Sequence, residues 1–209
     1  MKIIVFGATG SVGEKIVNQA LEKGYSVTAF VRNPEKLTSK SHPNLNIFQG
    51  DVLNLADVKE AVKNQDVVLC ALGDGKIGKI RAEGTKQIIT ALKDSTTNRF
   101  ICQSTIGAGN SYTNLNFIWK YVMFGFLLKK VLPDHNLQEK YIMESDLDYT
   151  IVRPSALTDG EISTNYQENF DETVKKLSLK ISRPDVANFM IQQIDSKKYL
   201  KKAEKMQKI

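Results

Sequence analysis

Short apolar runs alternate with amphipathic stretches along the first half of the chain. The apolar runs are rich in β-branched residues, and most are bounded by glycine, asparagine or proline, so they predict buried strands. The predicted strands are Lys2–Phe6, Tyr25–Val31, Asn46–Gln49, Asp66–Leu72, Arg99–Gln103 and, further along, Tyr149–Val152.

The stretches between these runs have the spacing of helices. In Ser11–Lys23, apolar residues recur on one helical face, and Gly24 is a suitable stop. Strands that alternate with helices over short connections predict an α/β fold: a Rossmann-like, doubly wound parallel sheet with helices on both faces, in a single domain. The other predicted helices are Leu55–Val62, Arg81–Leu92, a long segment Phe117–Met143, and a helix that follows Arg183-Pro184 and runs to Ile194.

Composition narrows the class of protein without defining its function. Hydrophobic residues make up 42% of the 209-residue chain and charged residues 25%, which is usual for a globular domain. Most of the formal charge of +6 comes from residues 196–209, where six lysines and one glutamate give +5. We interpret this segment as a solvated, frayed tail and expect no nucleic-acid binding by the folded body.

The sequence gives no sign of export, membrane insertion or a metal site. No leader pattern precedes the first apolar run, and we predict no transmembrane segment. Cys70 and Cys102 lie in apolar runs and are interpreted as buried thiols of a reducing compartment. Together with His42 and His135 they do not form a metal-binding pattern. We therefore expect a cytoplasmic protein without a metal.

A glycine-rich turn joins the first strand to the first helix. Its sequence is Gly7-Ala8-Thr9-Gly10-Ser11-Val12-Gly13. Gly7 permits a tight turn, Gly10 lets the backbone approach a pyrophosphate, and Gly13 lets helix and sheet pack closely. The helix N-terminus offers amide groups to an anion. In this strand–turn–helix setting the motif predicts dinucleotide binding by residues 1–104.

The end of the second strand distinguishes between two cofactors. An NAD site usually has a carboxylate there for the ribose 2′-hydroxyl, whereas this chain has Arg32. A guanidinium is well shaped for a 2′-phosphate, so we predict NADP(H), with NAD(H) used more weakly. The alternative is that Arg32 is a surface side chain without a role in cofactor binding. The ends of two later strands add candidate cofactor-binding residues. After the third strand come Asp51 and Val52, where Asp51 either contacts the adenine or caps a turn. After the fourth strand, the residues expected beside the ribose and nicotinamide are Ala71, Leu72 and Gly73.

Five short motifs carry a family resemblance. They are Gly7–Gly13, Val31–Pro34, Gly50–Val52, Ser104–Thr105 and Tyr149–Pro154. Together they resemble the atypical short-chain dehydrogenase/reductases, in particular the NAD(P)H-binding, NmrA-like branch, and are similar to the biliverdin-IXβ reductases, which are also flavin reductases. The resemblance extends from Met1 to about Ile194.

The resemblance implies a Rossmann-like fold, NADP(H), and reduction of a flat conjugated acceptor such as a flavin, quinone or bilin. By position, Ser104 would face the nicotinamide and the substrate, and Arg153, Pro154 and Ser155 would line the nicotinamide end of the cofactor. Ala156 stands where the family has a histidine after its prolines, which argues against a bilin. Residues 105–209 would then form the substrate-side part and the basic tail.

The proton-transfer motif of the wider superfamily is absent. None of the seven tyrosines has a lysine four positions later, so an activated tyrosine is not expected. Hydride transfer to a conjugated ring does not need this pair, because the ring delocalises the charge. The candidates for catalysis are Ser104, Tyr112 and His135, the last two as acids or orienting groups. A non-catalytic NADP(H)-sensing regulator of the NmrA-like type is the alternative.

Residues 117–128 are unusually aromatic and apolar for a segment beside a predicted site. Core or lid packing, a dimer interface and a membrane contact are the alternatives for this segment. In each case the expected partner of the site is a small-molecule substrate.

Overall fold

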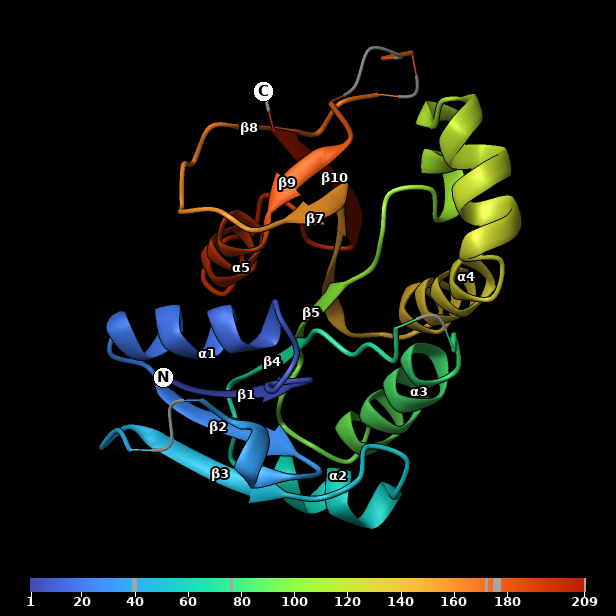
Figure 1. The fold of residues 1–209 in the computed structure, drawn as a ribbon. Helices are drawn as coiled ribbons and strands as arrows, with labels where there is room; N and C mark the ends of the chain where they lie inside the picture. The colour runs from blue at the N-terminus through green and yellow to red at the C-terminus, as the bar shows by residue number, and fades with distance from the viewer. Residues whose placement is uncertain (39–40, 76, 172, 175–177, 209) are drawn as a thin grey trace.

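The computed structural model describes residues 1–38, 41–75, 77–171, 173–174 and 178–208. Its strands form an eight-stranded sheet in the order β3-β2-β1-β4-β5-β6-β10-β8 (Figure 1). All neighbours are parallel except β10 and β8, which are antiparallel. The strands are β1 (Lys2–Phe6), β2 (Ser26–Val31), β3 (Leu45–Gln49), β4 (Val67–Cys70), β5 (Arg99–Gln103), β6 (Asp148–Pro154), β8 (Tyr166–Glu168) and β10 (Lys202–Lys208). A separate parallel pair joins β7 (Ala156–Thr158) and β9 (Lys180–Ser182).

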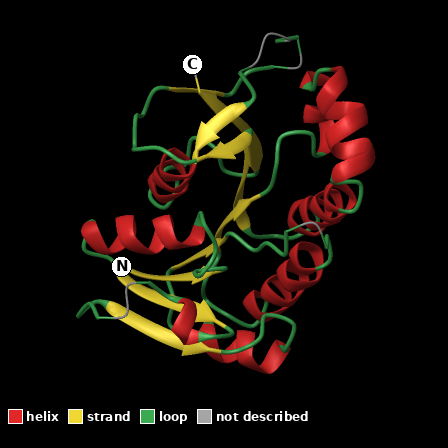
Figure 2. Cartoon of the chain, in the orientation of Figure 1, coloured by secondary structure: helices red, strands yellow, loops and turns green. Residues whose placement is uncertain are grey.

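Helices cover both faces of the large sheet (Figure 2). On one face α1 (Gly13–Glu22) packs beside α5 (Arg183–Gln192), and on the other α3 (Ile80–Leu92) lies between α2 (Leu55–Ala61) and α4 (Val131–Met143). Each face has its own buried apolar cluster. The predicted single-domain, doubly wound α/β fold is confirmed.

The order of the strands reverses between β1 and β4. The chain builds β2 and β3 on one side of β1, and then returns to build β4, β5 and β6 on the other side. In open parallel sheets such a reversal leaves a crevice at the carboxyl ends of the strands, because the connections diverge there. The glycine turn after β1 and the ends of β4 and β5 meet at this crevice.

The predicted long helix over residues 117–143 is two helices. The first is the π-helix η3 (Ile118–Leu127), which ends with a hydrogen bond from the Leu128 amide to the Met123 carbonyl. The second is α4. Between them the backbone at Lys130 packs so closely on Gly78 that a Cβ there would overlap the Lys130 carbonyl. The loop before α3 therefore packs directly on the backbone that joins the two helices.

The interpretation of residues 196–209 as a frayed tail is wrong. Residues 202–208 form β10, which pairs with β6 on one side and β8 on the other. Met206 is fully buried, and Lys205 lies over the Phe170 ring with its Nζ 5.4 Å from the ring centroid. Long charged side chains can bury their apolar stems in this way, so a lysine-rich sequence does not exclude a central strand. Ile209 lies outside the described residues.

Candidate functional site

The glycine turn has the geometry of an anion-binding loop. Gly7 has a left-handed backbone (φ 81°), and a Cβ on it would overlap the Ala71 carbonyl of the neighbouring strand end. A Cβ on Gly13 would overlap the Gly7 carbonyl, so both positions require glycine. No side chain caps the start of α1. The Gly10 and Glu14 amides donate to backbone carbonyls, and the other amide groups of the turn and the helix start can meet a phosphate.

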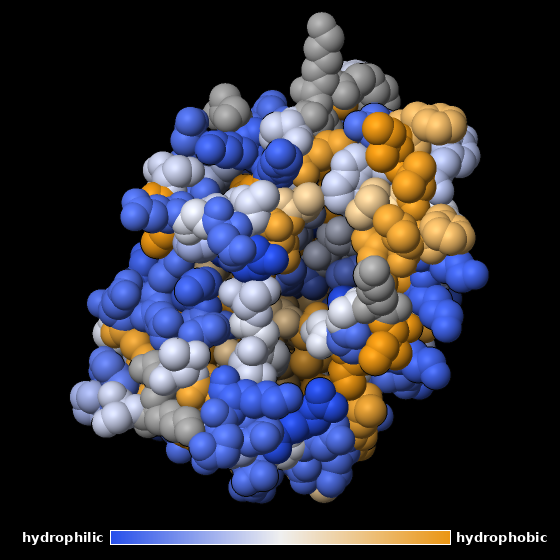
Figure 3. Space-filling model, viewed as in Figure 1, coloured by the Kyte–Doolittle hydropathy of each residue, from blue (hydrophilic) through white to orange (hydrophobic). Residues whose placement is uncertain are grey.

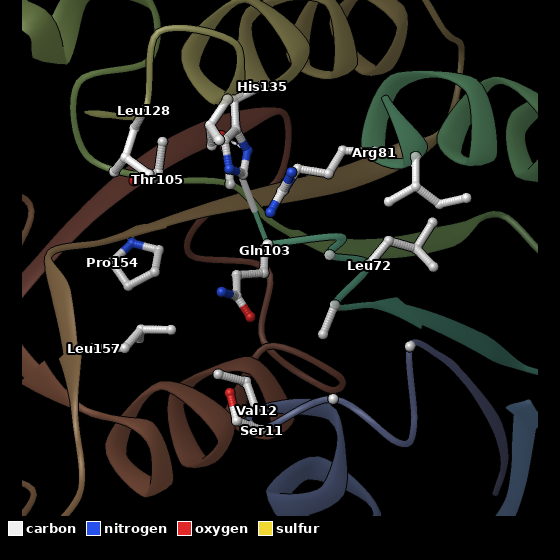
Figure 4. Close-up of a pocket in the computed structure, with 18 of the residues that line it drawn as sticks. Ser11, Val12, Leu72, Arg81, Gln103, Thr105, Leu128, His135, Pro154 and Leu157 are labelled. Atoms are coloured by element: carbon white, nitrogen blue, oxygen red, sulfur yellow. Dashed lines mark hydrogen bonds between the residues drawn. The ribbon is translucent and has the colours of Figure 1, made fainter. Parts of the chain in front are cut away.

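A cavity of about 600 Å³ opens beside this turn. Figure 4 shows Ser11 and Val12 on one side of it, His135 on the opposite side, and Gln103 between them. Most of the residues predicted for the site line this cavity together. They are Gly7, Thr9, Gly10, Ser11, Val12, Arg32, Val52, Ala71, Leu72, Gly73, Ser104, His135, Pro154 and Ser155.

Five predicted site residues are not among those that line the cavity. Ala8 is fully buried and Gly13 lies behind the turn, where both support the loop. Asp51 caps its own turn, since its Oδ1 accepts a hydrogen bond from the Leu53 amide at 3.0 Å. Tyr112 is exposed at the surface and stacks under the Lys120 ammonium.

Arg153, the fifth, joins β6 to α4. Its guanidinium makes two hydrogen bonds to the Glu139 carboxylate, at 2.9 and 2.6 Å, and a third to Asn110 Oδ1 at 2.6 Å. Both partners of the ion pair are almost completely buried. This geometry is that of a bidentate structural ion pair, and it turns the guanidinium away from the cavity.

The charged side chains that line the cavity are all basic: Arg32, Lys36 and Arg81. Arg32 follows β2, and the next residues form the short helix η1 (Pro34–Lys36), which Asn33 caps by accepting a hydrogen bond from the Glu35 amide. This turn brings Lys36 to the same cavity as Arg32. Within the described residues, no carboxylate lines the cavity, so the cavity favours an anionic ligand.

Arg81 is fixed by two carboxylates behind it. Its Nη1 lies 2.7 Å from Asp74 Oδ1 and 3.4 Å from Asp134 Oδ2. The Asp134 carboxylate also accepts hydrogen bonds from the backbone amides of Arg81 and Ala82. It therefore caps the start of α3 from the neighbouring helix α4. Asp134 is therefore a structural residue that connects the two helices.

A buried hydrogen-bond network lies at the end of the cavity opposite the glycine turn. His135 Nδ1 lies 3.4 Å from Ser104 Oγ and 3.2 Å from Gln138 Oε1. The Gln138 amide nitrogen in turn donates to Thr85 Oγ1 and to Cys102 Sγ. Gln138 therefore presents its oxygen to His135, which requires a proton on His135 Nδ1.

The same surroundings keep the imidazole neutral. Burial, together with the nearby Arg81 guanidinium, lowers the pKa of His135 to about 3. A neutral ring that donates from Nδ1 has Nε2 as a hydrogen-bond acceptor. His135 thus suits the role of an orienting group and does not supply an imidazolium acid at neutral pH.

Comparison with known proteins identifies the family. Residues 7–197 match the NAD(P)H-binding protein family. The chain belongs to this family. It is 32% identical over 205 residues to an uncharacterized chloroplastic protein of Arabidopsis thaliana, covering 91% of this chain and 71% of that protein.

Two solved structures share the fold of this NAD(P)H-binding protein over nearly their whole length. The anaerobilin reductase ChuY of Escherichia coli O157:H7 has a TM-score of 0.85 at 21% identity, and covers 100% of this chain and 97% of its own. A short-chain dehydrogenase/reductase of Veillonella parvula in complex with NADP has a TM-score of 0.84 at 19% identity, and covers 99% of this chain and 94% of its own.

Several lining residues of the NAD(P)H-binding protein were missed by sequence reasoning. Gln103 ends β5 directly before Ser104, and the strand-end argument that selected Ser104 could have found it. Lys36 and Arg81 carry no such signal, because each reaches the cavity from a turn or a helix start. The apolar lining residues include Trp119, Phe124, Leu128 and Val131. The first three lie in residues 117–128, for which core or lid packing was one of the alternatives from the sequence.

Two buried oxygens in the cavity wall have no hydrogen-bond partner among the described residues. They are Gln103 Oε1 and Ser155 Oγ, and both residues line the cavity. Buried polar atoms are nearly always paired in folded proteins, so such atoms commonly mark the place of a polar ligand. This observation, the glycine turn and the basic lining fit a dinucleotide with its phosphates and carboxamide.

Proposed function

We propose that the protein binds NADPH and reduces a small conjugated acceptor of the flavin, quinone or bilin type. One observation carries the proposal: a glycine turn and a helix N-terminus open into a cavity whose charged lining residues, as far as the structure describes the chain, are all basic. The NADP in the complex of the Veillonella parvula structure and the bilin-reducing activity in the name of ChuY support it.

Arg32 and Lys36 would hold the 2′-phosphate of the cofactor. They lie on either side of the Asn33-Pro34 turn and both line the cavity. A carboxylate in this position would repel the phosphate, whereas two cations attract it. The glycine turn and the start of α1 would hold the pyrophosphate. Gln103 and Ser155 would form hydrogen bonds with the polar groups at the nicotinamide end of the cofactor.

The acceptor would lie against the apolar wall formed by Trp119, Phe124 and Leu128. When bound, NADPH supplies a hydride to this acceptor. Among the described residues, none that lines the cavity is a carboxylic acid, a tyrosine or a cysteine, and the imidazole of His135 is neutral. The protein therefore orients two rings, and the single proton that accompanies the hydride comes from water. For a quinone, NADPH and one proton give NADP⁺ and the hydroquinone.

A regulatory protein that senses NADP(H) is the second candidate. Among the described residues that line the cavity there is no carboxylic acid, tyrosine or cysteine, and Tyr112 lies at the surface. Both observations favour the regulatory candidate, because they leave the site able to bind the cofactor without catalysis. This alternative requires the same cradle of Arg32 and Lys36 but no open acceptor site.

Calorimetry with NADPH, followed by NADPH oxidation assays with FMN, quinones and bilins, distinguishes the two functions. We expect binding and turnover with at least one acceptor class. Replacement of the apolar wall by Phe124→Ala should raise KM for the acceptor and leave NADPH affinity unchanged. Tight NADPH binding without turnover of any acceptor would replace the reductase by the sensor, and a lack of NADPH binding would exclude both.

A further inference from the structure

The π-helix η3, together with Phe117 directly before it, presents large hydrophobic side chains to solvent. Phe117 and Phe126 are 72% and 74% exposed, and Ile118 and Tyr121 are 61% and 62% exposed. Figure 3 shows hydrophobic side chains gathered at the upper right, over this helix and beside the hollow in the centre of the face. A contiguous exposed apolar surface of this kind is uncommon unless it meets a partner.

The charged residues in and next to this helix along the chain are of one sign. From Ser111 to Pro133 the sequence has three lysines, Lys120, Lys129 and Lys130, and no aspartate or glutamate. Lys129 and Lys130 are exposed directly after the helix. Exposed phenylalanine and tyrosine with flanking lysines are typical of helices that lie in the interface of an anionic bilayer.

A second copy of the chain is a less suitable partner. In a symmetric dimer the same patch faces itself, so the lysines of one copy would lie near those of the other. Lysine is depleted in the centre of such interfaces, and a single short helix covers less than the roughly 800 Å² per partner of a stable interface. An acidic lipid surface instead satisfies the apolar and the basic groups at once.

We propose that η3 is a docking surface for the surface of an anionic lipid bilayer. The helix lies flat on the headgroups, with Phe117, Tyr121 and Phe126 inserted and Lys129 and Lys130 among the phosphates. Among the described residues, no helix is both long enough and apolar enough to span a bilayer, which fits attachment to one leaflet. Binding does not require the nucleotide, so this proposal stands apart from the reductase function.

Flotation with lipid vesicles tests the proposal on the full chain. The wild type should bind vesicles of phosphatidylcholine with phosphatidylglycerol about tenfold better than vesicles of phosphatidylcholine alone. Phe117→Ser with Phe126→Ser should abolish binding to both. Lys129→Glu with Lys130→Glu should abolish the preference for the anionic vesicles.

Matched variants provide the controls. Met143→Ser with Ile162→Ser removes two exposed hydrophobic side chains elsewhere, and Lys23→Glu with Lys197→Glu makes the same charge change elsewhere. Both should bind as the wild type does. The proposal is overturned if the wild type does not bind anionic vesicles, or if the η3 variants bind like the controls.

Analytical ultracentrifugation in the absence of lipid tests the other occupant. A dimer that is lost on Phe117→Ser with Phe126→Ser, in a protein that does not bind vesicles, would assign η3 to a second copy and overturn the proposal. NADPH binding measured on the same variants shows whether each remains folded. A failure of the vesicle result leaves the NADPH result unchanged, so the two proposals fail separately.

Discussion

Arg32 determines the cofactor preference in our interpretation of the cavity. A charge-assisted contact to a phosphate contributes about 1.5–3 kcal/mol, so Arg32→Ala should weaken NADPH about 10- to 100-fold and NADH much less. Lys36→Ala should act in the same direction with a smaller effect, because lysine makes no bidentate contact. Titration of both nucleotides into each variant measures the ratio. Equal losses for NADPH and NADH would show that neither side chain holds a 2′-phosphate.

His135 gives a second residue-scale prediction, on stability. Its pKa is about 3 in the folded protein and 6.5 in an unfolded chain. The unfolded chain therefore binds a proton first as the pH falls, and the folded state is destabilised below about pH 6.5. Between about pH 7 and 5.5 the free energy of unfolding falls by about 1 kcal/mol for this reason. It falls further on acidification towards pH 3.

Urea unfolding at the two pH values checks this. His135→Gln should remove about 1 kcal/mol of the loss on acidification, whereas His42→Gln should retain the wild-type loss. If His135→Gln unfolds with the wild-type pH dependence, the imidazole is not held neutral by its surroundings.

The sequence was most informative where a residue's role is local. The positions of the glycine turn and of Arg32 at the cavity could be predicted, because a tight turn needs glycine and a strand end has a defined neighbour in the fold. The structural role of Arg153 could not be predicted, because its partner Glu139 lies on a helix 14 residues earlier. The position of an arginine in the sequence does not show which way its side chain points. Lys36 and Arg81 reach the cavity only through the folded turn and helix start.

At the scale of elements, β10 is the feature that the sequence concealed. A strand of alternating apolar and polar residues is recognisable, but residues 202–208 are mostly lysine, glutamate and glutamine. Their burial comes from two partners, β6 and β8, that are distant in the sequence. The first six predicted strands needed no such information, because each is an apolar run with a turn at its end.

Met206 tests whether β10 is part of the stable core. It is fully buried between β6 and β8, so Met206→Ala should lower the free energy of unfolding by about 2–5 kcal/mol. Lys208→Ala, at the exposed end of the same strand, should change it by less than about 0.5 kcal/mol. Chemical denaturation of both variants measures the difference. Similar small effects at both positions would mean that the strand frays in solution.

At the scale of the whole molecule, η3 connects two surfaces. Trp119 and Phe124 on its inner side line the cavity, while Phe117 and Phe126 on its outer side face solvent. Figure 3 shows the exposed hydrophobic side chains beside the hollow, so a helix that rests on a bilayer would bring this hollow close to the lipid. An acceptor dissolved in the membrane could then enter without crossing water, which matches the apolar wall of the acceptor side.

This arrangement predicts a dependence on where the acceptor is dissolved. With NADPH in solution, the wild type should reduce a long-chain quinone held in anionic vesicles, and Phe117→Ser with Phe126→Ser should slow that reaction about tenfold, in proportion to the lost membrane binding. The same variant should reduce a water-soluble quinone at the wild-type rate, because neither phenylalanine lines the cavity. Stopped-flow absorbance of NADPH measures both rates. Equal loss with both quinones would show that the substitutions disturb the cavity itself, and no loss with either would show that η3 does not deliver the acceptor.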